Sequence, residues 1–198
     1  MATQSEIKYN RLMEKAEELF INLGYRAVSM EDIAETAGIS KMTIYKHFAS
    51  KEDLFIEVVL SLMNKTYILI EEEMSKITGI LKKIDYLMQF NKETSKNYSI
   101  AFYKDCMSIP YVMEKLIEEK YNFSKMMFGN IIKEGMEKGE IRKVNVDFMT
   151  EMLIMILEGI TAKYSKKQFE SREEIEGLVE NFYDFLKYGL LGGDEVKK

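Results

Sequence analysis

Residues that break helices are scarce in this chain, and their scarcity limits what it can fold into. One proline and 11 glycines occur in 198 residues, and the runs between them are rich in Glu, Lys, Leu, Ile and Met, which favour helices. No segment shows the alternating pattern of Val, Thr and Tyr, bounded by turn residues, that predicts a β-strand. We therefore expect an all-α protein of about nine helices.

Three short helices are predicted within the first fifty residues. The first carries an apolar stripe and ends at Gly24. The stripe consists of Leu12, Ala16, Leu19, Phe20 and Leu23. The run Ser29-Met-Glu-Asp32 is a capping box that opens the second helix, which ends at Gly38. Ser40 is the candidate N-cap of the third helix, over residues 41–48.

This arrangement matches a helix-turn-helix unit, whose second element enters the major groove of DNA. No Asp or Glu occurs from Thr36 to Lys51, which is the longest acid-free run in the sequence. Residues 1–51 have no net charge, so the rest of the chain carries the whole net charge of −5. Because acidic side chains repel phosphates, a helix that faces DNA avoids them. We expect the acid-free run to be a docking surface.

Longer helices follow without a linker. The run Ser50-Lys-Glu-Asp53 is another capping box, and it begins a helix that reaches about residue 75. Further helices are expected at about 79–94, 97–107, 110–137, 146–167 and 172–190. Pro110 fits the first turn of its helix. Candidate N-caps for the last two helices are Asn145 or Asp147, and Ser171 in the run Ser171-Arg-Glu-Glu174.

Several classes of protein are excluded by what the sequence lacks. A single cysteine and a single histidine provide neither a disulfide framework nor a metal centre built from those residues. No GxxxxGK or HExxH motif is present, so we expect no enzyme, no cofactor and no metal. The N-terminus does not resemble a signal peptide, and the longest apolar stretch, about 149–160, contains two glutamates. We expect a soluble, cytoplasmic protein that does not contact a membrane.

The stretch VSMEDIAETAGISKMTIYKHFASKEDLF closely resembles the DNA-binding signature of TetR-family transcriptional regulators. In that family a short helix is followed by Gly-hydrophobic-Ser, then by Thr-hydrophobic-Tyr and Phe, and then by Ser or Asn with Lys-Glu. Each element is present here in order, and the specific match covers about residues 7–55. The resemblance implies a helix-turn-helix DNA-binding domain over 1–50 and a helical ligand-binding and dimerisation domain over 51–198.

The resemblance also implies which residues contact DNA. Thr43 and Lys46 are expected to face the groove, whereas Tyr45 and His47 are expected to reach phosphates. The full set of expected DNA contacts is Ser29, Thr36, Lys41, Met42, Thr43, Tyr45, Lys46, His47 and Lys51. Met42 replaces a small residue that is common in the family, which leaves the operator sequence open. Packing beside Phe48 is an alternative role for His47, and Tyr45 has a mainly structural alternative.

A small-molecule site among the C-terminal helices is implied as well. Eleven of the 15 methionines lie from Met63 onward, and methionine adapts to irregular apolar shapes, although ordinary core filling explains any one of them equally well. The candidate lining residues are Met63, Tyr67, Phe102, Tyr103, Cys106, Tyr121, Phe128, Met152 and Met155. Nearby acidic groups would suit a cationic amphiphile, and Lys104 at the mouth would suit a fatty acid or acyl-CoA. Both classes of ligand stay open.

A homodimer is expected because one helix-turn-helix module reads only a few base pairs, and a dimer reads a palindrome. Residues 146–160 are apolar almost all round, and the last helix has a wide apolar stripe. The candidate interface residues are Leu153, Leu157, Leu178, Phe182, Phe185 and Leu186. The alternative is that these two helices close the core of a monomer.

The sequence therefore predicts a sequence-specific transcriptional regulator that binds double-stranded DNA. The resemblance favours a repressor that leaves a palindromic operator when a small hydrophobic or amphipathic ligand enters the C-terminal helices. The alternative is an interaction protein with the same fold, which acts through a protein partner. DNA binding is favoured by the retained residues Thr43, Tyr45, Lys46 and Lys51.

Overall fold

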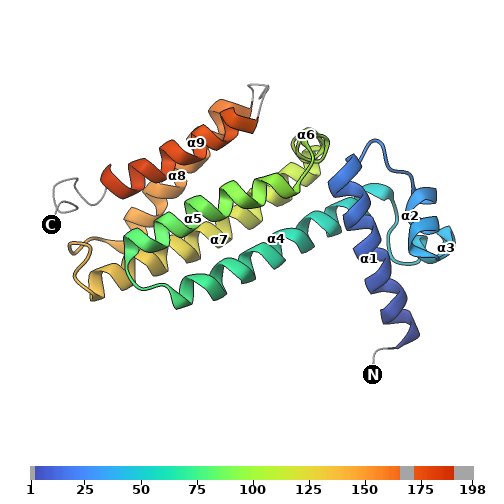
Figure 1. Cartoon of the computed structure of the whole chain (residues 1–198), viewed down its shortest axis with the longest axis horizontal. Coiled ribbons are helices and arrows are strands. Elements are labelled where there is room, and N and C mark those ends of the chain that lie inside the picture. Colours follow the sequence, from blue (N-terminus) through green and yellow to red (C-terminus); the bar gives the residue numbers. More distant parts are fainter. Residues whose placement is uncertain (1–2, 166–171, 190–198) are drawn as a thin grey trace. The chain divides into compact units, whose positions relative to one another are not determined.

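The computed structural model of the chain describes residues 3–165 and 172–189, which form helices and turns and contain no strand (Figure 1). The expected all-α class is confirmed. The chain divides into two compact units. The head unit consists of Met1–Tyr67 and Lys96–Ile117, and the bundle unit consists of Ile68–Ser95 and Glu118–Lys198. Helices α4 (Lys51–Lys76) and α7 (Pro110–Glu137) contribute residues to both units.

Helices α1 (Gln4–Leu23) and α2 (Met30–Ala37) end, and α2 and α3 (Lys41–Tyr45) begin, at the residues that the sequence predicts. Gly24 ends α1 with a φ of 83°, and its N–H donates to the Phe20 carbonyl at 2.9 Å. The Ser29 hydroxyl accepts from the N–H of Asp32 at 3.1 Å. The Ser40 hydroxyl caps α3 by accepting from the N–H of Thr43 at 3.2 Å.

The third helix is shorter than expected. The predicted helix over 41–48 ends at Tyr45, and residues 46 and 47 form a turn. The N–H of His47 donates to the Ile44 carbonyl three residues earlier, at 2.9 Å, and the N–H of Phe48 donates to the same carbonyl at 3.0 Å. This tightening of the last turn is common where a helix ends without a glycine cap. It keeps both Ile44 and Phe48 buried.

Helix α6 (Ile100–Ser108) belongs to the head unit, which the sequence does not predict. The N–H of Ser99 donates to the Ile21 carbonyl at 3.1 Å, and the Phe102 ring lies 5.8 Å from that of Phe55. The carboxylate of Asp105, which is 5% exposed, accepts from the backbone N–H of Arg26 at 3.2 Å. The Nε atom of Arg26 lies 3.2 Å from the other oxygen of that carboxylate. Helix α6 is therefore fastened to the turn that joins α1 and α2.

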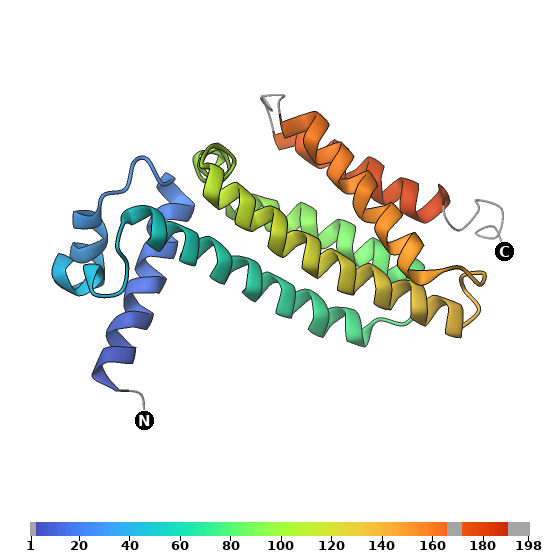
Figure 2. The same ribbon diagram turned by 180° about the vertical axis from the view of Figure 1, so that it is seen from behind.

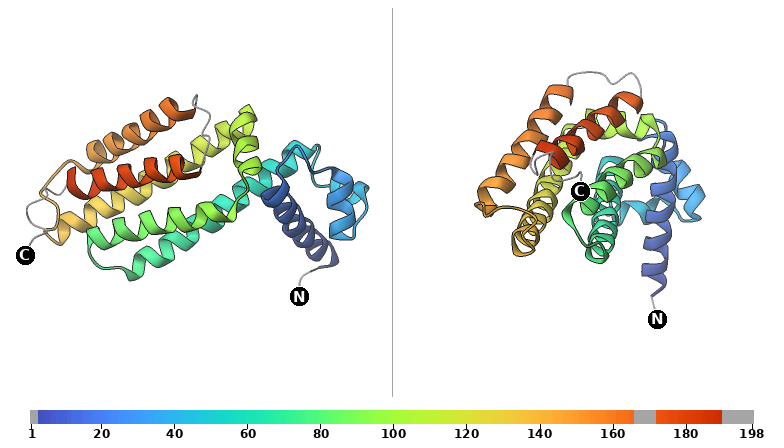
Figure 3. Two further views of the ribbon diagram at one scale, coloured as in Figure 1. Left: turned by 45° about the horizontal axis from the view of Figure 1, so that its top comes forward. Right: turned by 60° about the vertical axis from the view of Figure 1, so that its left-hand side comes forward.

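The bundle unit contains the remaining helices around a second apolar core. They are α5 (Ile80–Thr94), α8 (Val146–Ser165), α9 (Arg172–Asp184) and the π-helical segment η2 (Phe185–Gly189), with parts of α4 and α7. Figure 2 and Figure 3 show α8 in orange beside α9 in red. Ile84, Phe128 and Phe182 belong to one buried cluster, which joins α5, α7 and α9. The expected Ser171 cap lies outside the described residues.

The other predicted helix boundaries agree with the structure to within a few residues. Pro110 is the first residue of α7, and the Asn145 side chain caps α8 by accepting from the N–H of Phe148 at 2.9 Å. The compact units do not divide the chain at residue 50, since the head unit also includes α6. The expected functional division at residue 50 stays a prediction, because compactness does not report where DNA or a ligand binds.

The close approach of Gly24 to α6 gives a test of the head unit. A Cβ atom at Gly24 would lie 2.8 Å from the Asp105 carboxylate and 2.9 Å from the Ala101 side chain, whereas a Cβ at Gly79, whose φ is also positive, would meet nothing within 4 Å. Gly79→Ala is expected to lower the free energy of unfolding by about 1 kcal/mol, and Gly24→Ala by about 2 kcal/mol. Urea unfolding of both variants measures this. Equal losses would contradict the close approach.

Candidate DNA-binding surface and ligand cavity

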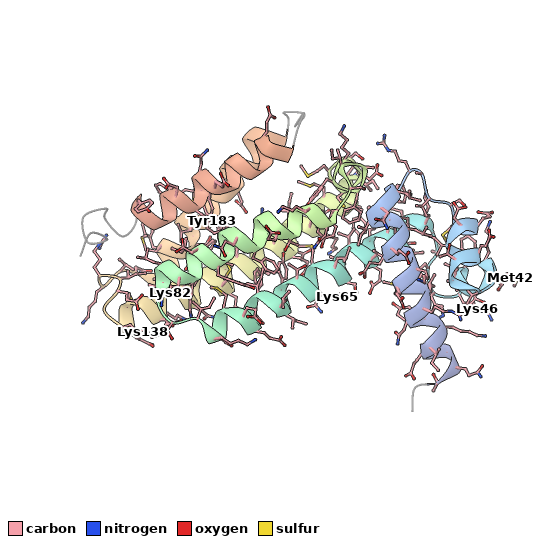
Figure 4. All side chains as sticks on the ribbon, in the orientation of Figure 1. Met42, Lys46, Lys65, Lys82, Lys138 and Tyr183 are labelled. Atoms are coloured by element: carbon pink, nitrogen blue, oxygen red, sulfur yellow. The ribbon has the colours of Figure 1, made fainter. Side chains whose placement is uncertain are left out.

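Helix α3 presents a short basic surface because its apolar residues hold it against the head unit. Ile44 is fully buried and Phe48 is 8% exposed, whereas Met42 is 75% exposed and Tyr45 is 49% exposed. Lys46 follows the last residue of the helix and is exposed as well. Met42 and Lys46 both lie on the outer side of the head unit in Figure 4. We call the exposed residues Met42, Tyr45, Lys46 and His47, together with half-buried Thr43, the α3 surface.

Three other expected DNA contacts already have partners within the head unit. Lys41 forms an ion pair with Glu31, which raises the pKa of the Lys41 ammonium and lowers the pKa of the Glu31 carboxyl. The Ser29 hydroxyl donates to the Asp32 carboxylate at 2.6 Å. The Thr36 hydroxyl donates to the Asp32 carbonyl at 2.7 Å. A DNA contact from any of the three would compete with these bonds, and such contacts stay predictions.

Lys51 is held in the head unit at the start of α4. Its Nζ donates to the carbonyls of Tyr25 and Val28, at 2.8 Å each, and lies 4.1 Å from the centre of the Tyr25 ring. An ammonium has three protons, so these two bonds leave one for a phosphate. The contacts nevertheless give Lys51 a structural role, which the sequence does not predict.

His47 packs against a residue that the sequence does not single out. Its ring lies 5.2 Å from that of Tyr9 in an edge arrangement, and 6.4 Å from that of Phe48. The alternative in which His47 packs beside Phe48 is thus part of what the structure shows, although His47 remains exposed. Tyr9 lies on α1, so the imidazole connects α1 to the end of the α3 surface.

The bundle unit contains a cavity of about 460 Å³. That volume lies within the range of small-molecule sites. Helix α5 contributes Ile80, Ile84 and Leu87, and α7 contributes Phe128, Ile131 and Ile132. Helix α8 contributes Met149 and Leu153, and the turn before it contributes Gly139, Glu140, Ile141, Arg142 and Val144. Aliphatic side chains therefore form most of its wall.

Among the nine residues predicted to bind a ligand, Phe128 alone lines this cavity. Phe102 and Cys106 are buried in the apolar core of the head unit, and Met63, Tyr67 and Tyr103 lie elsewhere in that unit. Within the bundle unit, the Tyr121 hydroxyl donates to Glu151 at 3.1 Å. Met152 and Met155 are 39% and 61% exposed. The prediction favoured aromatic residues and methionine, whereas the aliphatic spacing of Ile80, Ile84 and Leu87 marks the wall.

Two of the predicted dimer contacts are buried within the chain itself. Leu153 is 4% exposed and Phe182 is 7% exposed, and both belong to the bundle core. Phe185 is 46% exposed. The side chains of Leu157, Leu178 and Leu186 lie outside what the structure describes. An exposed stripe of Phe148, Met152 and Met155 on α8 is a better described face for a partner.

Cys106 offers a chemical test of the head core. Burial, with the neighbouring Asp105 carboxylate, raises the pKa of its thiol to about 12. At pH 8 the reactive thiolate is then only about one part in ten thousand. We expect Ellman's reagent to label Cys106 in urea but not in the native protein, which a spectrophotometric time course measures. Fast stoichiometric labelling of native protein at pH 8 would show that the thiol is accessible.

Neither a metal centre nor a membrane span is visible in the parts of the chain that the structure describes. Over residues 3–165 and 172–189, no three side chains of His, Cys, Asp or Glu are grouped so that they could hold a metal ion. None of the helices, over the same residues, has the length and apolar character needed to cross a membrane.

Comparison with known proteins points to the same class of protein as the helix-turn-helix geometry, a DNA-binding regulator. Residues 12–58 match the family described as bacterial regulatory proteins of the tetR family. The transcriptional activator FasR of Mycolicibacterium smegmatis is 27% identical over 106 residues, which are 52% of this chain and 48% of FasR. The transcriptional repressor KstR2 of Mycobacterium tuberculosis is 25% identical over 148 residues, which are 72% of this chain and 73% of KstR2. The chain thus spans about half of FasR and about three quarters of KstR2.

A solved structure shares the fold over nearly the whole chain. The transcriptional regulator FadR of Bacillus subtilis, solved in complex with stearoyl-CoA, has a TM-score of 0.62 and 18% identity, and covers 91% of this chain and 98% of its own. A capped helix-turn-helix that presents an acid-free basic surface defines the chain as a DNA-binding transcriptional regulator. Its residues 12–58 are a DNA-binding domain of the TetR family. The relatives named above are transcriptional regulators, not enzymes.

Proposed function

We propose that this protein is a repressor that binds a palindromic operator as a homodimer through the α3 surface. The observation that carries the proposal is the α3 surface itself. Its apolar anchors are buried, its outer side chains are exposed, and no acidic residue occurs from 36 to 51. Thr43, Lys46 and Met42 read bases in this proposal, and Tyr45 and His47 position the helix on phosphates. The repressor KstR2 supports this direction of regulation, although FasR is an activator.

A small apolar ligand releases the protein from DNA in this proposal. The cavity of about 460 Å³ in the bundle unit supports it, as does the stearoyl-CoA complex of FadR, a protein with the same fold. A ligand needs only to bind the DNA-free state more tightly, and a differential affinity of about 3–5 kcal/mol shifts most of the population. Residues 1–50 then carry DNA recognition, and residues 51–198 carry ligand binding and dimerisation.

Binding to the DNA upstream of its own gene tests the proposal. Fluorescence anisotropy should show a duplex from this region bound more tightly than a shuffled duplex of equal composition, with an affinity that falls steeply as salt rises. Mass measurement of the complex should find two chains on each duplex. Equal weak binding of both duplexes at low salt would reject the proposal and favour the interaction protein that acts through a protein partner.

A further inference from the structure

The cavity of the bundle unit has an apolar wall and a charged rim. Its wall is formed by aliphatic side chains of α5, α7 and α8 and by Phe128. Its two charged residues, Glu140 and Arg142, both come from the turn that joins α7 to α8. A ligand that fills such a site has a long apolar body, because polar groups against the wall would lose their hydrogen bonds to water.

The Glu140 side chain already has a hydrogen-bond partner within the bundle unit. Its carboxylate accepts a hydrogen bond from the N–H of Ile80, at 2.7 Å, in the first turn of α5. This bond satisfies a helix N-terminal donor that has no partner inside the helix. Glu140 therefore acts as a cap for α5, and its charge is not directed to a ligand.

Arg142 is the charged group that remains for a ligand. It is exposed, and the structure gives it no hydrogen bond or ion pair among residues 3–165 and 172–189. One acidic side chain near the end of α7, Glu134, is neutralised from two sides, because Lys83 and Lys138 both pair with it. Glu134 is thus engaged by these two lysines, and the Arg142 guanidinium stays unpaired among the residues that the structure describes.

The turn that carries Arg142 is fixed in place. The N–H groups of Glu140 and Ile141 both donate to the Gly135 carbonyl, at 2.8 and 3.0 Å. A Cβ atom at Gly135 would lie 2.1 Å from the Ile80 side chain and 2.9 Å from that of Ile141. The absence of a side chain at Gly135 thus lets α5 and the turn pack closely against α7. This packing holds the backbone of Arg142 at the rim of the cavity.

We propose that this cavity binds an anionic amphiphile whose aliphatic body fills the wall and whose carboxylate pairs with Arg142. The planar guanidinium of arginine matches a carboxylate with two parallel hydrogen bonds. A cavity of about 460 Å³ holds roughly fifteen groups of about 30 Å³ each, the share of one water molecule. A chain of about ten to fourteen carbons fits that size. The inference rests on the proposed ligand-responsive function and names its ligand class.

Calorimetric titration of the full chain with three probes of equal chain length tests the inference. Dodecanoate, dodecanol and dodecyltrimethylammonium share one straight apolar chain and carry an anionic, a neutral and a cationic head group. Dodecanoate is expected to bind at least tenfold more tightly than the other two, and Arg142→Ala should remove that advantage. Lys143→Ala is the matched control, because it removes the next positive charge along the exposed turn. It should leave the affinity for dodecanoate within twofold.

Two outcomes would overturn the inference. One is equal or tighter binding of the cation, and the other is an equal loss in Arg142→Ala and Lys143→Ala. Ile84→Phe, which fills the cavity from α5, should weaken all three probes at least tenfold, and unchanged binding would place the ligand elsewhere. A thermal melt of each variant identifies any that fails to fold, and Leu87→Phe then replaces Ile84→Phe.

The same titrations separate this inference from the proposed function. If the protein binds its upstream DNA but none of the probes shows the expected charge preference, the inference alone fails. If dodecanoate binds through Arg142 but does not release the DNA in an anisotropy assay, the inference stands and the proposed release by ligand fails.

Discussion

Lys46→Glu is expected to weaken binding to the operator by more than 100-fold. Lys46 is exposed at the end of α3, in a run of residues without any acid. Lys46→Ala loses one favourable contact, which costs about 1–3 kcal/mol, and also relaxes the preference at one base step. The glutamate adds repulsion from the phosphates to that loss. Fluorescence anisotropy with the operator duplex and with single-base variants of it measures both effects.

Lys82→Glu is the matched control for this prediction. Lys82 is an exposed lysine on α5 in the bundle unit, so its reversal changes the net charge of the chain by the same amount. The affinity for the operator should change by no more than about threefold. At about 0.1 M salt, repulsion between charges more than about 10 Å apart is largely screened. An equal loss in both variants would mean that net charge, not the α3 surface, governs the affinity.

Asp105→Ala is expected to destabilise the head unit by about 3 kcal/mol. The carboxylate of Asp105 is buried, and it holds the backbone N–H and the side chain of Arg26. Its removal leaves that N–H without its partner and loosens α6 from the turn between α1 and α2. Arg26 itself is mostly exposed, so its charge returns to water and adds little to the loss. Thermal and urea unfolding measure the change.

Two further variants show whether the carboxylate or only its volume matters. Asp105→Asn keeps the shape and one oxygen acceptor, so it should lose about half as much stability as Asp105→Ala. Arg26→Ala removes the exposed guanidinium but keeps the backbone N–H, and should cost less than about 1 kcal/mol. A loss in Arg26→Ala as large as in Asp105→Ala would assign the effect to the ion pair and not to the bond with the backbone.

The predictable parts of this fold are those that depend on neighbours in sequence. Gly24, Ser29 and Ser40 act within three or four residues, so their roles as caps follow from spacing alone, and the structure confirms them. The early end of α3 was not predicted, because Phe48 continues the apolar spacing that a helix would have. Phe48 is buried because it packs into the core of the head unit, and not because a helix continues through it.

The unpredicted parts depend on contacts between residues far apart in sequence. Arg26 and Asp105 are separated by 79 positions, and Lys51 meets a carbonyl that is 26 positions away. Nothing in the local pattern distinguishes these charged residues from solvated ones. The cavity illustrates the same limit. Its wall reads as ordinary core spacing along α5, and only the packing of three helices leaves a volume between them.

The ion pair between Lys41 and Glu31 has a consequence for experiments on DNA binding. Glu31 acts as a built-in counterion for Lys41, and the lowered pKa of its carboxyl keeps it charged at neutral pH. The negative charge of Glu31 cancels part of the positive charge that Lys41 brings to a phosphate, so the pair releases fewer of the counterions bound to DNA than a free lysine would. A salt titration thus counts fewer cationic groups than the DNA touches, and Glu31→Gln should make the dependence steeper by about one ion.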